Sequence, residues 1–220
     1  MLKLHGFPFS NYHNIVKHAL MVKGVDFEEH ITYPGSPELA AVNPLGKVPA
    51  MTTEAGTALS ESSVLLEYLE DKYPETPLFP ANPEERGKVR RLTKLAELYL
   101  DLPARRLLPA VFGNAQIPEA TLAEVREGLE LGVAGLHALA QFAPYVAGPD
   151  LTMADLYLRY ALVIPKIVGP SQLGWDVVAA VPGLAEWDAM MADSDIAHQI
   201  DADRAANTAE FMAYLAKRSA

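Results

Sequence analysis

NPLGKVPA, at residues 43–50, places a turn directly before a short strand that begins with Val-Pro. Pro49 has no N–H to donate to a β-ladder, so a strand that begins with it pairs incompletely with its neighbours. If the bond before Pro49 is cis, the backbone of Val48 turns outward and offers its N–H and C=O to an extended peptide ligand by strand addition. The alternative interpretation is an ordinary edge-strand proline without a ligand.

Short strand-like and helical patterns surround this stretch in the N-terminal third of the chain. Strands are expected at residues 1–5, 27–31, 48–52 and 57–59, and helical segments at 14–22, 36–42 and from 64 to the Tyr73-Pro74 pair. The last helix carries Val64, Leu65, Tyr68 and Leu69 on one apolar face. The predicted order is therefore β-α-β-α-β-β-α, an α/β arrangement.

Four prolines between residues 74 and 83 mark a domain boundary, because proline removes backbone donors and disfavours a continuous helix or a central strand. We expect a first domain at residues 1–75, a linker at 76–82 and a second domain at 83–220. Beyond the linker, long helical patterns dominate. They run roughly over residues 83–102, with a kinked continuation past Pro103, and over 118–141, 152–168, 182–191 and 208–217. The C-terminal part is predicted to be all-α.

Composition and charge exclude several classes of protein and site. The formal net charge of −10 disfavours a general affinity for nucleic acid or anionic lipid. The absence of cysteine excludes a disulfide scaffold, a Cys-based zinc site and a protein thiol nucleophile. The six histidines show no metal-binding spacing, so no metal is expected. We find no signal peptide pattern and no long apolar run, and we predict a cytoplasmic protein without a membrane partner.

Two further segments place a serine where a helix starts. Ser10 lies in the turn before the first helix, and Ser62 lies before the helix that begins near Val64. Backbone donors and the positive end of the helix dipole point out of such segments, so each could hold an anion. Glu61 adds an acid beside Ser62, a pair that suits the carboxylate and ammonium of an α-amino acid terminus. The alternative for both serines is an N-cap that stabilises the helix by ~1 kcal/mol.

The residues around Ser10 and a second helix start, at residues 152–155, limit what these segments can do. Ser10 has no G-x-S-x-G elbow or base constellation around it, so we interpret it as a hydrogen-bond donor and not as a nucleophile. Residues 152–155, Thr-Met-Ala-Asp, fit a capping box ahead of an apolar run. We assign that box to folding, with a stability cost of about 1 to 2 kcal/mol on disruption.

Taken together, these segments resemble the cytosolic glutathione S-transferase family, in its bacterial, serine-type, zeta-like and theta-like section. Phe9-Ser10 ahead of NYHNIVKHAL resembles the active-hydroxyl segment of the family, and NPLGKVP resembles its N-P-x-G-K-V-P segment. The stretch from Glu61 to Pro74 resembles its E-S-x-x-I-x-x-Y-L-x-x-K-Y-P helix, and residues 152–155 its second-domain capping box. The resemblance implies a thioredoxin-like N-terminal domain, an all-α C-terminal domain and a homodimer.

The resemblance also implies how glutathione is held, chiefly by the first domain. Lys47 would lie near the glycyl end, Val48 would pair with the tripeptide backbone beside a cis Pro49, and Glu61 with Ser62 would hold the γ-glutamyl group. Such a site would take glutathione as a co-substrate.

The glutathione sulfur would accept a hydrogen bond from Ser10, with Tyr12 as the alternative donor. Family members with a cysteine at this place favour disulfide exchange, so the absence of cysteine near Ser10 indicates conjugation. A free thiol has a pKa of ~8.5, and one hydrogen bond plus the helix end could lower it by ~1 to 2 units.

The electrophile is expected between Ser10 and the first long helices of the second domain. Candidates chosen by expected position are Tyr99, Pro103, Arg106 and Phe112. We predict an enzyme that conjugates glutathione to a small hydrophobic electrophile, or uses it for isomerisation, dehalogenation or peroxide reduction. The alternative functions are a non-catalytic glutathione or hydrophobic-ligand binding protein and a structural or regulatory domain without ligand.

Overall fold

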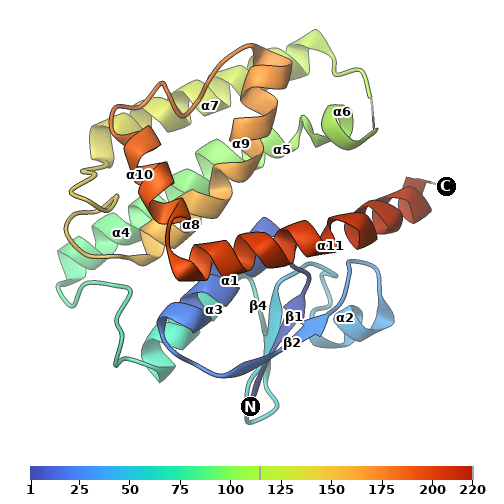
Figure 1. Cartoon of the computed structure of the whole chain (residues 1–220), viewed down its shortest axis with the longest axis vertical. Helices are drawn as coiled ribbons and strands as arrows, with labels where there is room; N and C mark the ends of the chain where they lie inside the picture. Colours follow the sequence, from blue (N-terminus) through green and yellow to red (C-terminus); the bar gives the residue numbers. More distant parts are fainter. Residues whose placement is uncertain (114, 220) are drawn as a thin grey trace. The chain divides into compact units, whose positions relative to one another are not determined.

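The structure is a computed structural model that describes residues 1–113 and 115–219, with side chains described up to Lys217. Its backbone contacts divide the chain into two compact units (Figure 1). One unit joins Met1–Leu78 to Asp193–Ala220, and the other is Phe79–Ala192. The expected domain bounds, with 193–220 in the helical domain, differ from this grouping, which adds the last helix to the N-terminal unit.

The N-terminal unit contains a four-stranded sheet in the order β2-β1-β3-β4. β1 and β2 are parallel, as expected for two strands joined through a helix, whereas β3 is antiparallel to both β1 and β4. Figure 1 shows α2 on one side of the sheet and α1 with α3 on the other. The thioredoxin-like α/β prediction is confirmed for this unit. The bounds are β1 Leu2–Gly6, α1 Asn11–Val22, β2 Phe27–Ile31, α2 Pro37–Val42, β3 Ala50–Thr52, β4 Ala58–Ser60 and α3 Ser62–Lys72.

A buried ion pair holds the proline-rich segment that follows α3. Lys23 Nζ donates to Glu70 Oε2 at 2.7 Å and to the carbonyl oxygens of Tyr73 and Thr76. The second lone pair of Glu70 Oε2 accepts from the Leu78 N–H at 3.0 Å. Because both charges are nearly inaccessible to solvent, each is paired and hydrogen-bonded, as a buried charge must be.

The second unit is helical, and its centre is α8, Met153–Ala161, in which every residue is buried. α8 packs against α4, α9 and α10 and against a π-helical segment that continues α4. The all-α prediction is confirmed for this unit. The other bounds are α4 Pro83–Leu95, the π-helical segment Ala96–Asp101, α5 Leu102–Arg105, α6 Leu108–Gly113, α7 Glu119–Leu139, α9 Val163–Val168, a second π-helical segment Gly169–Leu173, and α10 Leu184–Ala192.

The capping box at the start of α8 is confirmed and does more than cap the helix. Asp155 Oδ2 accepts from the backbone N–H and the hydroxyl of Thr152, both at 2.9 Å. Asp155 Oδ1 accepts from the Val146 N–H at 2.7 Å and from the indole N–H of Trp187 at 2.9 Å. One fully buried carboxylate therefore joins the α7–α8 loop, α8 and α10.

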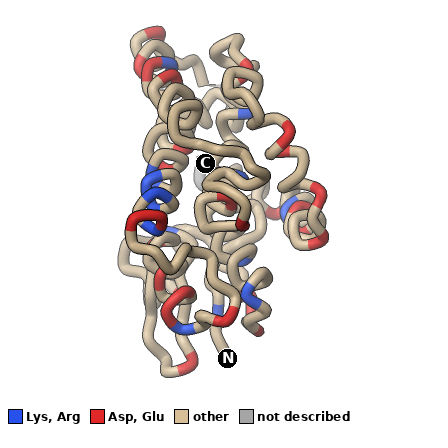
Figure 2. The backbone as a smooth tube through the Cα atoms, turned by 90° about the vertical axis from the view of Figure 1, so that its left-hand side faces the viewer, with Lys and Arg blue, Asp and Glu red and all other residues tan. Residues whose placement is uncertain are grey.

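Figure 2 marks the positions of Lys and Arg along the backbone of this acidic chain, and several of them follow one another along the same segment. One such segment is α4, where the guanidinium groups of Arg86 and Arg90 lie 5.1 and 5.3 Å from the ring centre of Phe79. These cation–π contacts fix the start of the second unit to its first helix.

The last helix, α11 Asp195–Ser219, is much longer than the segment 208–217 expected from its apolar pattern. Its N-terminal half is polar and alanine-rich, with only Ala197 and Ile200 fully buried. Contacts with α1 hold this half in the N-terminal unit. In the described part of the chain, no helix is both long and apolar enough to cross a membrane.

Candidate functional site

The strand register brings three loop segments to the same end of the sheet. Ala50, the first residue of β3, pairs with His5 near the end of β1 and with Ser60 at the end of β4. In an antiparallel pair the start of one strand lies beside the end of the other. The segments that continue from these three ends are therefore neighbours: the turn before α1, the Val48–Pro49 bond and the start of α3.

Ser10 is the N-cap of α1, and its contacts leave its hydroxyl hydrogen available. Ser10 Oγ accepts from the His13 N–H at a long distance of 3.4 Å, and the Ser10 N–H donates to Phe7 O at 3.0 Å. Among the described residues, no acceptor receives the hydroxyl hydrogen of Ser10. The capping and donor interpretations are thus compatible, because a hydroxyl can accept a bond from the helix and donate outward at the same time.

The Val48–Pro49 bond is cis, as the family resemblance implied. Within the described chain, neither the N–H nor the C=O of Val48 makes a backbone hydrogen bond. Asn43 shapes this turn: its buried side chain donates to Lys47 O at 2.8 Å and accepts from the Leu45 N–H at 3.1 Å. Sequence reasoning treated Asn43 only as part of a motif. Its role is to hold the turn that presents Val48.

Glu61 and Ser62 begin α3 in an uncommon conformation. Glu61 has φ 70° and ψ 116°, in a region that residues other than glycine rarely adopt. Strain of this kind costs of order 1 to 3 kcal/mol and concentrates at functional sites. Glu61 is the N-cap, and its side chain makes no cap bond. Capping by a serine is therefore the wrong interpretation at this helix, where Ser62 instead lies inside the first turn and is 5% exposed.

Comparison with known proteins identifies the family of this chain. A family model described as "Glutathione S-transferase, N-terminal domain" matches residues 4–77. A glutathione S-transferase from Pseudomonas putida is 41% identical over 213 residues, which cover 96% of this chain and 96% of that protein. The chain belongs to the glutathione S-transferase family.

Solved structures of glutathione S-transferases share the fold over nearly the whole chain. A glutathione S-transferase from Methylobacterium radiotolerans in complex with glutathione sulfonate is 25% identical, with a TM-score of 0.77, and the match covers 90% of this chain and 93% of that one. A bacterial maleylpyruvate isomerase, described as a zeta-class glutathione S-transferase, is also 25% identical, with a TM-score of 0.70 over 90% and 95% of the two chains.

Tyr12, which the sequence predicted as the alternative donor to the sulfur, lies in the first turn of α1 and not in the loop before it. The helix begins at Asn11, three residues earlier than expected, because Ser10 caps it. Tyr12 is half-buried and two residues from Ser10. The choice between Ser10 and Tyr12 stays a prediction.

Lys47 is exposed, and none of the residues the structure describes forms an ion pair or hydrogen bond with its ammonium group. The ammonium therefore remains available to a carboxylate ligand. Its proposed place at the glycyl end of glutathione stays a prediction.

The four candidates for the electrophile site all lie in the helical unit but differ in their surroundings. Tyr99 and Phe112 are 42% and 37% exposed. Pro103 faces α7, since a Cβ built on Gly128 would lie 3.3 Å from its ring. Arg106 pairs with Glu124 of α7 at 2.7 Å. The assignment of these residues to an electrophile pocket stays a prediction.

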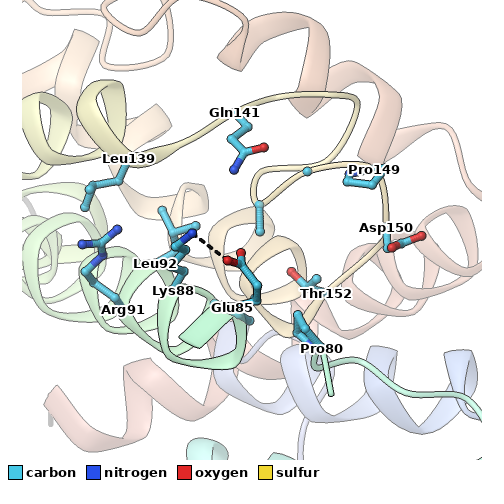
Figure 3. Close-up of a pocket in the computed structure, with 13 residues that line it drawn as sticks. Pro80, Glu85, Lys88, Arg91, Leu92, Leu139, Gln141, Pro149, Asp150 and Thr152 are labelled. Atoms are coloured by element: carbon cyan, nitrogen blue, oxygen red, sulfur yellow. Dashed lines mark hydrogen bonds and ion pairs between the residues drawn. The ribbon is translucent and has the colours of Figure 1, made fainter. Parts of the chain in front are cut away.

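A pocket of about 230 Å³ lies elsewhere in the helical unit, and its lining includes none of the four candidates (Figure 3). In Figure 3, Arg91 and Lys88 extend from α4 and Gln141 lies on the loop that follows α7, while Lys88 pairs with Glu85 on the same helix. That ion pair is exposed, so it contributes little to stability or to binding.

A charged network begins at His13, three residues after Ser10 on α1. His13 is fully buried, and its Nε2 lies 2.7 Å from Glu29 Oε1, while Lys17 Nζ donates to Glu29 Oε2 at 2.6 Å and to Asp203 Oδ2 at 2.8 Å. Burial lowers the pKa of His13. A neutral imidazole donating to Glu29 leaves Nδ1 without a hydrogen, and Nδ1 packs against Gly6, where any Cβ would lie 2.4 Å away. Sequence reasoning examined the histidines only for metal-binding spacing, found none, and missed this network.

Acidification should weaken this network through Glu29. Burial alone would raise the pKa of Glu29, but hydrogen bonds from His13 and Lys17 hold it at about 2, below its ordinary value of 4.5. A carboxylate with a depressed pKa stabilises the fold above its unfolded pKa, and this stability is lost as the pH falls from about 4.5 toward 2. Glu29→Gln should therefore lower the free energy of unfolding by about 2 kcal/mol at pH 7, after allowance for solvent screening.

Urea unfolding followed by far-ultraviolet circular dichroism at several pH values tests this prediction. The difference between wild type and Glu29→Gln should shrink as the pH falls through that window. A difference that stays constant with pH would contradict it. Glu28→Gln is the matched control, because Glu28 is exposed and pairs only loosely with Lys3, at 3.5 Å.

Proposed function

We propose that this glutathione S-transferase family member binds glutathione, stabilises its thiolate and transfers it to a small hydrophobic electrophile. The observation that carries the proposal is the Ser10 hydroxyl, which caps α1 and donates to none of the described residues. It belongs to the segments that the strand register gathers at one end of the sheet. The relatives named above support a glutathione-dependent transferase or isomerase.

The proposed roles follow from the chemistry of each segment. Glutathione is an extended tripeptide, and the unpaired N–H and C=O of Val48 suit its backbone by strand addition. The Glu61 carboxylate suits the ammonium of the γ-glutamyl group, and Ser62 with the start of α3 suits its carboxylate. Lys47 suits the glycyl carboxylate. Ser10, with Tyr12 as the alternative, donates to the sulfur.

The gain in attack rate depends on how far the site lowers the pKa of the glutathione thiol. At pH 7 a thiol with a pKa of ~8.5 is only a few per cent ionised. A hydrogen bond to a charged group is worth ~1.5 to 3 kcal/mol, enough with the helix end to lower the thiol pKa by ~1 to 2 units. The attack rate rises less than the thiolate fraction, because nucleophilicity falls with pKa with a slope of ~0.4 to 0.5. Orientation of the electrophile supplies the rest of the acceleration.

Oligomeric state, location and biological role are further parts of the proposal. We propose a homodimer, which sedimentation velocity would test, and a cytoplasmic protein that detoxifies small electrophiles. The second candidate function is a non-catalytic binding protein, which would hold glutathione but show no turnover with any member of a broad electrophile panel.

Replacing Ser62 with Ala tests the glutathione site. The variant should bind glutathione about tenfold more weakly by calorimetry, because one charge-assisted hydrogen bond to the γ-glutamyl carboxylate is lost. The matched control is Ser63→Ala, one residue further along α3, which should bind normally. Unchanged binding by Ser62→Ala would contradict the assigned site. Wild-type binding without turnover would favour the carrier.

A further inference from the structure

Helix α11 contacts the Ser10 turn on both of its flanks, although nearly two hundred residues of sequence separate them. The contacts fall on Phe9, which precedes Ser10, and on Asn11, which follows it. Both partners belong to the same compact unit. The residues of α11 involved lie three apart, so they share one face of the helix.

Asn207 is the contact on the N-terminal flank. Its Oδ1 accepts from the Phe9 N–H at 3.2 Å. Its Nδ2 donates to the Tyr33 hydroxyl at 2.9 Å and to Glu210 Oε2 at 3.0 Å. Both hydrogens of the amide group are thereby used, which fixes the orientation of the side chain with its oxygen toward Phe9. Asn207 is 8% exposed, so water competes little for these bonds.

Arg204 is the contact on the C-terminal flank. Its guanidinium donates to Asn11 Oδ1 and lies 4.4 Å from the centre of the Phe9 ring. The Phe9 ring also stacks on the ring of Phe211, with 4.3 Å between the ring centres and an interplanar angle of 15°. Phe9 is thus held by its backbone N–H and by its ring, both from α11.

We propose that Arg204 and Asn207 are positioning residues for the Ser10 hydroxyl. They hold the backbone on either side of Ser10 and so direct its O–H toward the glutathione sulfur. This inference rests on the proposed function, in which Ser10 donates to that sulfur. The strength of a hydrogen bond falls steeply with misalignment, so a small shift of the turn reduces thiolate stabilisation without removing any group that touches glutathione.

A separate ion pair between α11 and α1 provides a matched control. Asp203 fixes the same part of α11 to α1 through Lys17 at 2.8 Å, yet no bond joins it to residues 9–11. Asp203→Asn weakens the attachment of the helix and leaves the contacts with Phe9 and Asn11 in place. A purely structural role of α11 would make Asp203 and Asn207 variants behave alike.

The test is the pKa of the thiol of bound glutathione, measured by ultraviolet titration of the full-length protein, with the Kd for glutathione and kcat. Asn207→Ala should raise the thiol pKa by about 0.5 to 1 unit and lower kcat at pH 6.5 by about threefold to tenfold. The Kd should change less than about threefold, and Asp203→Asn should keep the wild-type pKa. The double variant Asn207→Asp with Glu210→Gln, which restores an acceptor for the Phe9 N–H, should recover most of the shift.

Two outcomes would overturn the inference alone: an unchanged thiol pKa in Asn207→Ala, or an equal rise in Asn207→Ala and Asp203→Asn. An unshifted pKa in the wild-type protein would instead overturn the proposed function, and the inference with it. If Asn207→Ala does not fold, judged by circular dichroism, Arg204→Gln takes its place, with an expected rise of about 0.3 to 0.5 units.

Discussion

Ser10→Ala is expected to raise the pKa of bound glutathione by about 1 to 2 units and to lower kcat/KM at pH 6.5 by about 10- to 100-fold. The physical reason is the loss of the hydroxyl hydrogen, which is donated to no other described residue and is therefore available to the sulfur. Since the binding segments at residues 47–49 and 61–62 are untouched, the Kd for glutathione should change by less than about threefold. The pH dependence of kcat/KM should move to higher pH by the same shift as the thiol pKa.

Controls separate the donor role of Ser10 from its cap. Alanine also removes the N-cap acceptor of α1, which costs about 1 kcal/mol of stability, whereas Ser10→Thr keeps both the cap and the O–H. Ser10→Thr should therefore retain a lowered thiol pKa. Tyr12→Phe should retain it too if Ser10 is the donor. If the thiol pKa of bound glutathione stays lowered in Ser10→Ala and rises in Tyr12→Phe, Tyr12 is the donor to the sulfur.

Asp155→Ala is expected to lower the free energy of unfolding of the helical unit by about 3 to 5 kcal/mol. Four donors point at this buried carboxylate, so alanine leaves the Trp187 indole N–H and the backbone N–H groups of Val146 and Thr152 without an acceptor. The cost therefore exceeds the value of about 1 to 2 kcal/mol expected for a capping box alone. Both tryptophans of the chain, Trp175 and Trp187, lie in this unit, so urea unfolding followed by tryptophan fluorescence measures it directly.

Two further variants test whether the hydrogen bonds to the Asp155 carboxylate account for this loss of stability. Asp155→Asn should also destabilise, because one of its two ends then presents an NH2 group to a pair of donors. Trp187→Phe removes one donor, leaves the carboxylate with three and trims a buried ring, so its cost should be about 1 to 3 kcal/mol, below that of Asp155→Ala. An Asp155→Ala cost no larger than that of Thr152→Ala would show that capping is the whole contribution.

The segments of the candidate site could be predicted because each is a short-range sequence pattern. The Val-Pro pair before a strand, a serine at the start of a helix and an acid beside a second serine are each short-range patterns, and the strand register gathers them. The cis bond before Pro49 followed from the family resemblance, since the residues alone left a trans edge strand as an alternative. The conformation of Glu61 could not be predicted from the sequence, because glutamate rarely adopts a positive φ.

The role of α11 could not be predicted, for a physical reason. Its N-terminal half carries no strong apolar periodicity, and what holds it is a set of polar and charged contacts with partners nearly two hundred residues away: Lys17 with Asp203, Asn11 with Arg204, and Phe9 with Asn207. Pairings of this kind leave no local pattern. For the same reason the sequence assigned the last helix to the helical part, whereas the backbone contacts group it with the N-terminal unit.

The measurement that tests the central claim most directly is an ultraviolet pH titration of glutathione bound to the wild-type protein. The account predicts saturable binding and a thiol pKa about 1 to 2 units below the free value of ~8.5. Saturable binding with an unshifted pKa would contradict thiolate stabilisation and favour a carrier, and the absence of binding would contradict both functions.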